Sequence, residues 1–143
     1  MNLQPVIERL KPVSKRPIGS VAALAALGDK PPIFFPAIYV VPDGEQATAP
    51  RRLAGIHDQQ LICNFVVVLM ISVGGANPVT EAAELQALID ATETLIVGWV
   101  HPDAEGEATE HRGSALLSLS PGRVEWGLRF ATKRRLRRQV VTS

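Results

Sequence analysis

Alternating apolar residues mark the strongest element of the chain. Between residues 61 and 73 every odd-numbered residue is apolar, and several even-numbered ones, such as Ile62, Val66 and Met70, are apolar as well. This pattern predicts a strand over Gln60–Val73. Because both of its faces are apolar, we expect this strand to be central and covered on both sides, or to be buried by a partner subunit.

A second apolar run precedes this strand in the chain. Ile33–Val41 is rich in β-branched and aromatic residues and therefore predicts another strand. Pro36 within it indicates an edge strand or a bulge, because proline cannot donate a ladder hydrogen bond. The residues Pro-Asp-Gly at positions 42–44 predict the turn that ends this strand.

Three segments predict helices. The longest follows Thr80, which we expect to cap it, and it carries apolar residues spaced three and four apart on one core-facing stripe. The stripe consists of Leu85, Leu88, Ile89, Thr92, Leu95, Ile96 and Trp99. Shorter helices are predicted over Val6–Leu10 and over residues 21–27, where Ser20 is the expected cap and Gly28 the stop.

The C-terminal part of the chain predicts a β-hairpin around the turn Pro121-Gly122. In its second strand the residues of one parity are apolar, namely Val124, Trp126, Leu128, Phe130 and Leu136. The residues of the other parity are mostly charged, namely Glu125, Arg129, Lys133, Arg135 and Arg137. This alternation predicts one buried face and one solvated face.

The remaining segments predict loops. Glu45–His57 has no periodicity and is expected to be a long exposed loop that carries Arg51 and Arg52. Pro102–Glu110 is expected to be a solvated acidic loop, and both loops could order only on contact with neighbouring subunits. Gln139–Ser143 is expected to be disordered.

These elements define the predicted fold. We expect an α/β (α+β) protein with a mostly antiparallel four-stranded sheet, helices packed on it, and the order α–β–β–α–β–β. No internal repeat or linker divides the chain, so residues 1–138 are expected to form a single domain. The longest apolar run is shorter than the ~20 residues of a membrane span, and the N-terminus lacks a signal peptide, which predicts a soluble protein made in the cytoplasm.

Charge is strongly segregated along the chain, although the net charge is only +1. Residues 1–60 hold seven basic and five acidic groups, a net of +2. Residues 61–110 hold eight acidic and no basic groups, whereas residues 111–143 hold eight basic groups and one acidic group. Segments of −8 and +7 can pair within one molecule, and they also suit head-to-tail assembly of several copies.

Candidate catalytic and metal-binding residues do not form a recognisable site. Cys63 lies within an apolar run, which predicts a buried and inert thiol. His101 and His111 flank a run of carboxylates, but their spacing matches no established ligand pattern. Gly74-Gly75 is not followed by the lysine and hydroxyl residue of a phosphate-binding loop. We therefore predict no catalytic residues, no metal site and no cofactor.

The basic segment Lys133–Arg138 allows two interpretations. Its lysine and arginines could follow a phosphate backbone, so the alternative function is a small nucleic-acid-binding module that uses the basic C-terminal strand. However, no aromatic residues lie between the charges for base stacking, and the chain as a whole is not basic. A solvated or interfacial strand end is the interpretation that the pattern favours.

Four stretches together resemble a known family. They are the helix "AALAAL" with the following "PAIYVVPDGE", the segment "GIHDQQLICNFVVVLMI", the helix end "LIVGWVHP", and the hairpin "GSALLSLSPGRVEWGLRFATKRRLRR". They span most of the chain from Val21 to Arg138. In order and spacing they resemble the tail terminator-like proteins of long-tailed bacteriophages and prophages.

The resemblance implies a structural role without a cofactor. It implies a ring, typically of six copies, that caps the head-proximal end of the tail tube, stops its polymerisation and provides the docking surface for the head or neck. The implied partners are other copies of the chain, the tail tube protein, a head–tail connector or neck protein, and the sheath if the tail is contractile. DNA would only pass through the lumen, and no membrane is involved. The implied location is the virion tail, after assembly in the host cytoplasm.

A closed ring needs two different complementary patches on each subunit, and the segregated charges supply candidates for both. The expected interface residues are Arg51, Arg52, Arg129, Lys133, Arg135 and Arg137 on the basic side and Asp103, Glu105, Glu107 and Glu110 on the acidic side. Reversing the charge of Arg135 and Arg137 to glutamate is predicted to weaken subunit association and its dependence on salt.

Overall fold

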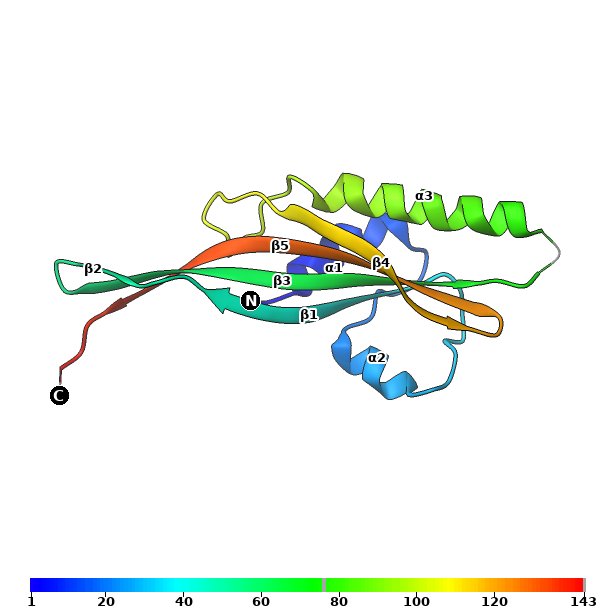
Figure 1. Ribbon diagram of the computed structural model, residues 1–143, viewed down its shortest axis with the longest axis horizontal. Helices are drawn as coiled ribbons and strands as arrows, with labels where there is room; N and C mark the ends of the chain where they lie inside the picture. Colours follow the sequence, from blue (N-terminus) through cyan, green and yellow to red (C-terminus); the bar gives the residue numbers. More distant parts are fainter. Residues whose placement is uncertain (76, 143) are drawn as a thin grey trace.

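The computed structural model describes residues 1–75 and 77–142. Within them the chain forms α1 (Gln4–Leu10), the 3-10 turn η1 (Lys11–Val13), α2 (Val21–Leu27), β1 (Ala37–Ala47), β2 (Arg51–Leu53), β3 (Ile56–Ser72), α3 (Pro78–Ile96), β4 (Glu110–Ser120) and β5 (Arg123–Gln139) (Figure 1). No helix of this described part is long and apolar enough to cross a membrane.

The strands form one antiparallel sheet in the order β1-β3-β5-β4, and β2 pairs with β3 outside this path. β3 and β5 are each 17 residues long and pair along their whole length, from Ile56 opposite Gln139 to Ser72 opposite Arg123. The predicted α+β class and antiparallel sheet are confirmed. The sheet has five strands rather than four, because the short β2 adds one strand next to β3.

The main core lies between one face of the sheet and the helices α1 and α3. Apolar side chains at odd positions of β3, such as Phe65, Val67 and Leu69, pack there against Leu128 and Phe130 of β5. The helices contribute the buried residues Val6, Leu10, Ile89 and Ile96. The apolar stripe of α3 thus faces the core, as its spacing predicted.

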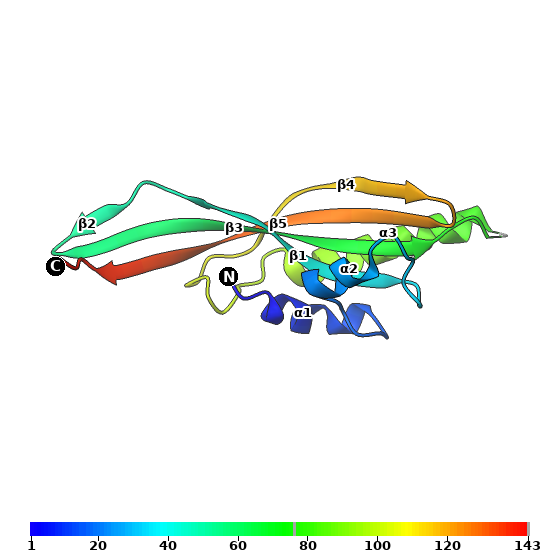
Figure 2. The ribbon, with the colours of Figure 1, turned by 90° about the horizontal axis from the view of Figure 1, so that it is seen from below.

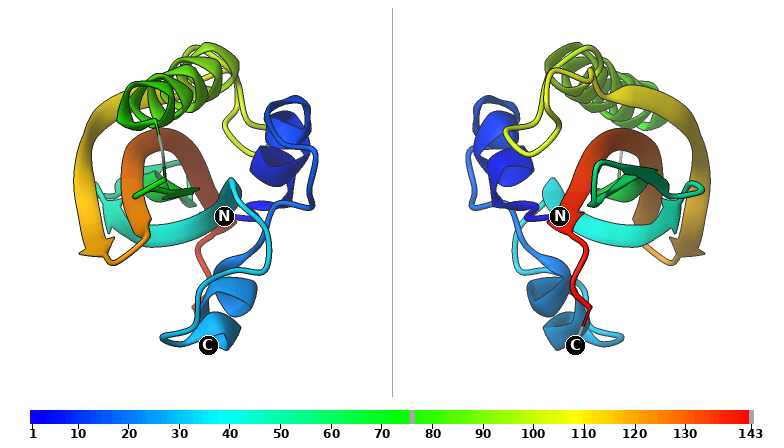
Figure 3. Two further views of the ribbon diagram at one scale, coloured as in Figure 1. Left: turned by 90° about the vertical axis from the view of Figure 1, so that its right-hand side faces the viewer. Right: turned by 90° about the vertical axis from the view of Figure 1, so that its left-hand side faces the viewer.

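The opposite face of the sheet is covered by α2 (Figure 3). Tyr39, Val68 and Met70 form a smaller cluster there, packed against Leu24 and Leu27 of α2. Helices on both faces explain why β3 is apolar on both sides, so the prediction of a central, doubly covered strand is confirmed.

Strand β1 differs from its predicted bounds. It begins at Ala37 rather than Ile33, so Pro36 precedes the strand instead of lying in it. The segment at 42–44 does not end the strand, because β1 continues to Ala47 after a shift of register between Pro42 and Glu45. Gly44 has a φ of +87°, so the turn residues form a bulge within the strand.

The predicted loop Glu45–His57 is wrong, because most of it is strand. Its first residues complete β1, Arg51–Leu53 forms β2, and Ile56 begins β3 after a tight turn at Ala54-Gly55. These strands are exposed and polar, so they lack the apolar alternation by which a half-buried strand is recognised. They form because the long partner strands β3 and β5 extend far enough to pair with them.

Part of the sheet projects beyond the helices. We call this part the strand arm, and define it as β2, residues 56–60 of β3 and residues 135–139 of β5. None of its described residues belongs to either core cluster. Figures 1 and 2 show it pointing away from α2 and α3, with the C-terminus near its tip. Five residues of strand span about 17 Å, so the arm is a substantial projection.

The structure corrects the cap of α3. Asn77, not Thr80, is the N-cap residue, and its side-chain oxygen accepts a hydrogen bond from the Thr80 amide at 3.1 Å. Thr80 lies within the first turn. By contrast, Ser20 caps α2 as predicted, by accepting from the Ala23 amide at 3.4 Å. Both asparagine and threonine are good caps, so the sequence alone did not distinguish the two candidates.

Replacing Asn77 with alanine is therefore expected to lower the free energy of unfolding by about 1 kcal/mol, because the Thr80 amide loses its partner. Thr80→Ala is the matched control, because it leaves the Asn77 cap in place. Urea unfolding of both variants measures the difference. A larger loss for Thr80→Ala than for Asn77→Ala would contradict the observed cap.

The C-terminal hairpin β4–β5 forms around the predicted turn, and the apolar parity of β5 supplies the buried Leu128 and Phe130. Gln139, which the sequence predicted to be disordered, is the last residue of β5. Gln139 pairs with Ile56, and the Val140 amide donates to the Gly55 carbonyl at 2.8 Å. Ser143, the last residue of that prediction, lies outside the described residues.

Candidate functional site

Four of the six predicted basic interface residues lie on the strand arm. Arg51 and Arg52 belong to β2, and Arg135 and Arg137 belong to the end of β5. Lys133 lies at the base of the arm, half-buried opposite Ile62. The sixth, Arg129, is exposed but lies in the middle of β5, opposite Val66. The structure therefore separates Arg129 from the cluster with which the sequence grouped it.

Asp58 forms ion pairs with two of the arginines of the arm. Its Oδ2 lies 3.2 Å from Nη1 of Arg135, and its Oδ1 lies 3.5 Å from Nε of Arg137. The Asp58 side chain is only 16% exposed, so these pairs are partly shielded from water. Sequence analysis missed Asp58 because the pairing of residue 58 with residue 137 depends on the register of β3 and β5.

Three of the predicted acidic residues lie between α3 and β4, and Glu110 is the first residue of β4. Several of them already have partners in the same chain. Oε2 of Glu105 lies 3.7 Å from Nη1 of Arg137, and Oε2 of Glu110 lies 3.0 Å from Nη2 of Arg112. Asp103 lies beside His101, at 3.9 Å. Glu107 is exposed. Part of the basic and acidic segregation is thus neutralised within the molecule.

This in-chain pairing changes how the double reversal of Arg135 and Arg137 would act. Glutamates at these positions would face Asp58 and Glu105, so the arm itself would be destabilised by like-charge repulsion. Loss of assembly in that variant would therefore have two explanations, the loss of an intersubunit contact and the destabilisation of the arm itself.

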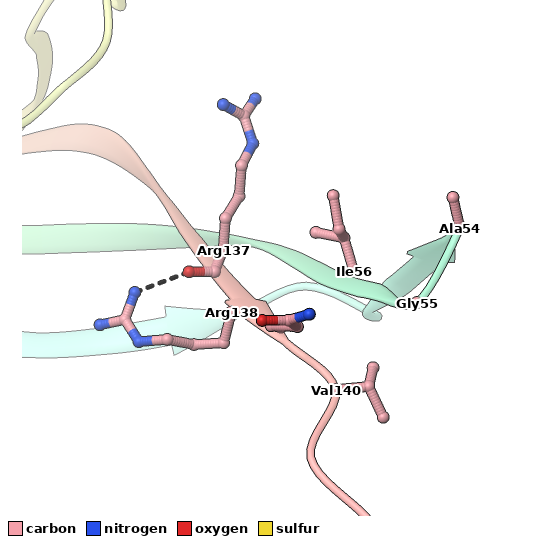
Figure 4. A pocket seen from close by; sticks show the side chains of 7 residues that line it. Ala54, Gly55, Ile56, Arg137, Arg138 and Val140 are labelled. Atoms are coloured by element: carbon pink, nitrogen blue, oxygen red, sulfur yellow. Dashed lines mark hydrogen bonds between the residues drawn. The ribbon is translucent and has the colours of Figure 1, made fainter.

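Three arginines of the arm remain directed outward. Arg51 and Arg52 are exposed, and neither forms an ion pair with a described residue. Arg138 is also exposed, and its Nη1 donates to the Arg137 carbonyl at 2.7 Å. Figure 4 shows Arg137 and Arg138 on opposite sides of β5, beside a shallow pocket that Ile56 and Val140 also line. The tip of the arm therefore combines positive charge with exposed apolar groups.

A carboxylate also joins the N-terminal segment to the base of the arm. Oε1 of Glu45 lies 3.1 Å from the Met1 amine and 3.5 Å from Nη2 of Arg134, and it accepts from the Cys63 thiol at 3.3 Å. The hydrogen bond from the amine lowers the pKa of Glu45. Burial raises the pKa of Cys63, so the thiol stays protonated at neutral pH, as expected of an inert cysteine.

The two histidines considered as metal ligands have separate environments. His101 is buried, with Nε2 2.7 Å from the Asn2 carbonyl and Nδ1 accepting from the Asp103 amide at 3.0 Å. His111 lies on β4, where Nε2 is 3.5 Å from Glu93 of α3. No group of three or more potential metal ligands occurs within residues 1–75 and 77–142.

A second exposed surface lies at the other end of the molecule, on α3 and β4. Val79 is 80% exposed, and Leu116 and Leu119 of β4 are 50% and 71% exposed. β4 is an edge strand of the sheet. Exposed leucines on an edge strand favour association with another surface. Sequence analysis did not single out these residues, because apolar positions in a strand are expected to be buried.

The described residues thus provide two exposed surfaces of different chemistry and no recognisable catalytic site. The chain matches the family model for the phage tail terminator protein over residues 1–141. No curated protein matches the chain significantly. The family match confirms the resemblance found in the sequence, and it also confirms that the chain is not an enzyme, because the family is structural. The chain belongs to the phage tail terminator family, and is therefore a component of the virion tail that associates with the tail tube.

Proposed function

We propose that this protein forms a closed ring, of six copies, at the head-proximal end of the tail tube. The ring stops tube polymerisation and provides the docking surface for the head–tail connector or neck protein. If the tail is contractile, the sheath contacts it as well. DNA passes through the lumen, and the ring assembles in the host cytoplasm before it becomes part of the virion.

The observation that carries this proposal is the presence of two unlike surfaces at opposite ends of one subunit. The strand arm is basic, whereas α3 holds four acidic residues and no basic ones. An interface between unlike surfaces is heterologous, and it generates a closed ring when the rotation between neighbours divides a full turn. A cap also needs one face that fits the tube and another that refuses a further tube ring, which such an asymmetric subunit supports.

The proposal is tested with the purified chain and its cognate tail tube protein. Light scattering after size-exclusion chromatography is expected to give the mass of six copies, either alone or on tubes. Electron microscopy is expected to show tubes that are shorter in the presence of the protein and carry density at one end. A monomer that leaves tube length unchanged would overturn the proposal.

The same preparation tests the alternative function. If the chain were a nucleic-acid-binding module, fluorescence anisotropy would detect tight binding to duplex DNA that weakens steeply with salt. A ring-forming cap is expected to show no such binding at physiological salt. Monomeric protein with strong, salt-sensitive DNA binding would favour the alternative.

A further inference from the structure

We propose that the strand arm of one copy packs on the α3–β4 surface of a second copy. We define the α3–β4 surface by residues of both elements. From the side of α3 next to β4 it includes Val79, Gln86, Asp90 and Glu93, and from β4 it includes the exposed Leu116 and Leu119. The inference rests on the proposed ring, because it assigns the two surfaces that join neighbouring subunits.

Charge complementarity is the first argument. The strand arm contains five arginines and one aspartate, a net of +4. The α3–β4 surface contains Asp90 and Glu93 and no basic residue, a net of −2. In the arm, Arg51 and Arg52 are exposed without an in-chain ion pair to a described residue, so they are available to a partner. Complementary potentials of this kind orient two proteins and accelerate their association.

Helix geometry places acidic and apolar groups of α3 on the side next to β4. The contact of Glu93 with His111 marks this side. Residues rotate by about 100° per position around a helix, so Val79, Gln86 and Asp90 lie within about 60° of Glu93. Asp90 is exposed, and its carboxylate accepts from Gln86 Nε2 at 2.9 Å. The surface is therefore apolar with a negative border.

Apolar groups match as well as charges. The arm carries Ile56, which is 46% exposed, and the adjoining C-terminal residue Val141 is 85% exposed. The α3–β4 surface offers Leu116 and Leu119 on an edge strand. Burial of these groups against one another removes apolar area from water at about 25 cal/mol per Å². The charges then specify the orientation in which the apolar groups meet.

The arrangement of the subunit requires this contact to be intermolecular. The arm projects from one end of the sheet, whereas the N-terminal part of α3 and the β4–β5 turn lie at the other end (Figure 1). An arm cannot fold back onto its own α3–β4 surface without breaking the pairing of β3 with β5. A second copy of the chain is the occupant that we propose. Its strand arm can pack on the α3–β4 surface of the first copy, and its own α3–β4 surface can receive the arm of a further copy.

The experiment is a charge exchange. Arg51→Glu with Arg52→Glu reverses the two exposed charges of the arm that have no in-chain ion pair to a described residue, and Asp90→Lys with Glu93→Lys reverses the two acidic charges of the α3–β4 surface. Each double variant is expected to lose assembly, with at least a tenfold higher concentration needed for half-assembly in light scattering. The variant that carries all four changes is expected to regain assembly, because both surfaces are then complementary again.

Mixing provides a second readout. Equal amounts of the arm-reversed and surface-reversed variants are expected to assemble together in alternation, although neither assembles alone. Lys15→Glu with Lys30→Glu is the matched control, since both lysines are exposed and lie outside the arm. This control is expected to assemble like the wild type. Circular dichroism and thermal unfolding verify that each variant is folded.

The outcomes separate this inference from the proposed function. If the arm-reversed variant forms rings as readily as the wild type, the inference is wrong and the ring proposal stands. If both reversals abolish assembly but neither the fourfold variant nor the mixture restores it, the two surfaces do not contact each other and the inference is also overturned. If the wild type itself is monomeric, alone and on tubes, the proposed function fails.

Discussion

Replacing Phe130 with alanine is expected to lower the free energy of unfolding by about 3–5 kcal/mol, which is a large part of the stability of a domain this size. Phe130 is fully buried opposite Phe65, with the two ring centroids 5.5 Å apart. The ring of His111 also packs edge-on against it at 5.6 Å. Removing the ring leaves a cavity where β3, β4 and β5 meet, and chemical denaturation measures the loss.

Leu119→Ala is the matched control for this prediction. Leu119 is also an apolar residue of the β4–β5 hairpin, but it is 71% exposed, so its loss is expected to change the stability of the monomer by no more than about 0.5 kcal/mol. Similar losses for the two variants would contradict the buried position of Phe130 and the exposed position of Leu119. The arm is expected to lose order together with the sheet in Phe130→Ala, because it consists of the same strands.

His101→Ala is expected to lower the free energy of unfolding by about 2–4 kcal/mol. His101 is 1% exposed, and each ring nitrogen has a backbone partner, the Asn2 carbonyl for Nε2 and the Asp103 amide for Nδ1. Alanine would leave both backbone groups without a partner and open a cavity beside Trp99, whose ring lies 5.5 Å away. Urea unfolding measures the stability.

The same substitution is expected to loosen the acidic loop. His101 holds the start of the segment that places Glu105 beside Arg137, so limited proteolysis is expected to cut within residues 102–110 faster in the variant. His111→Ala is the control, because its side chain is 34% exposed and it lies on β4. Equal stability and equal cleavage in His101→Ala and the wild type would show that His101 does not anchor the loop.

Sequence periodicity predicted helices and strands most reliably where the apolar residues of one element all pack against one core. The stripe of α3 and the odd positions of β3 were predicted because apolar side chains recur at the helical and strand periods that bring them to one face. The predicted loop at Glu45–His57 was wrong for the opposite reason. Its strands are exposed and polar, and their existence depends on partner strands that are distant in the chain.

The candidate interface was predicted in part. Arg51, Arg52, Arg135 and Arg137 were named from the sequence, and the structure brings all four to one arm. Asp58 and the exposed leucines of β4 were missed, because neither ion pairing nor exposure is encoded in a local pattern. The roles of these residues in subunit contacts remain predictions.

The sequence by itself determined the fold class, the core-facing positions, the segregation of charge and the family, because each depends on residue type and spacing along the chain. Only the tertiary structure decided which charges neutralise one another. Arg135 and Arg137 meet Asp58 and Glu105 through the register of β3 with β5 and the placement of the acidic loop, whereas Arg51 and Arg52 stay exposed. The attraction between two charges weakens as the distance between them grows, so an ion pair forms only where the fold brings the two groups close together. For segments that are remote in the sequence, the tertiary structure sets that distance.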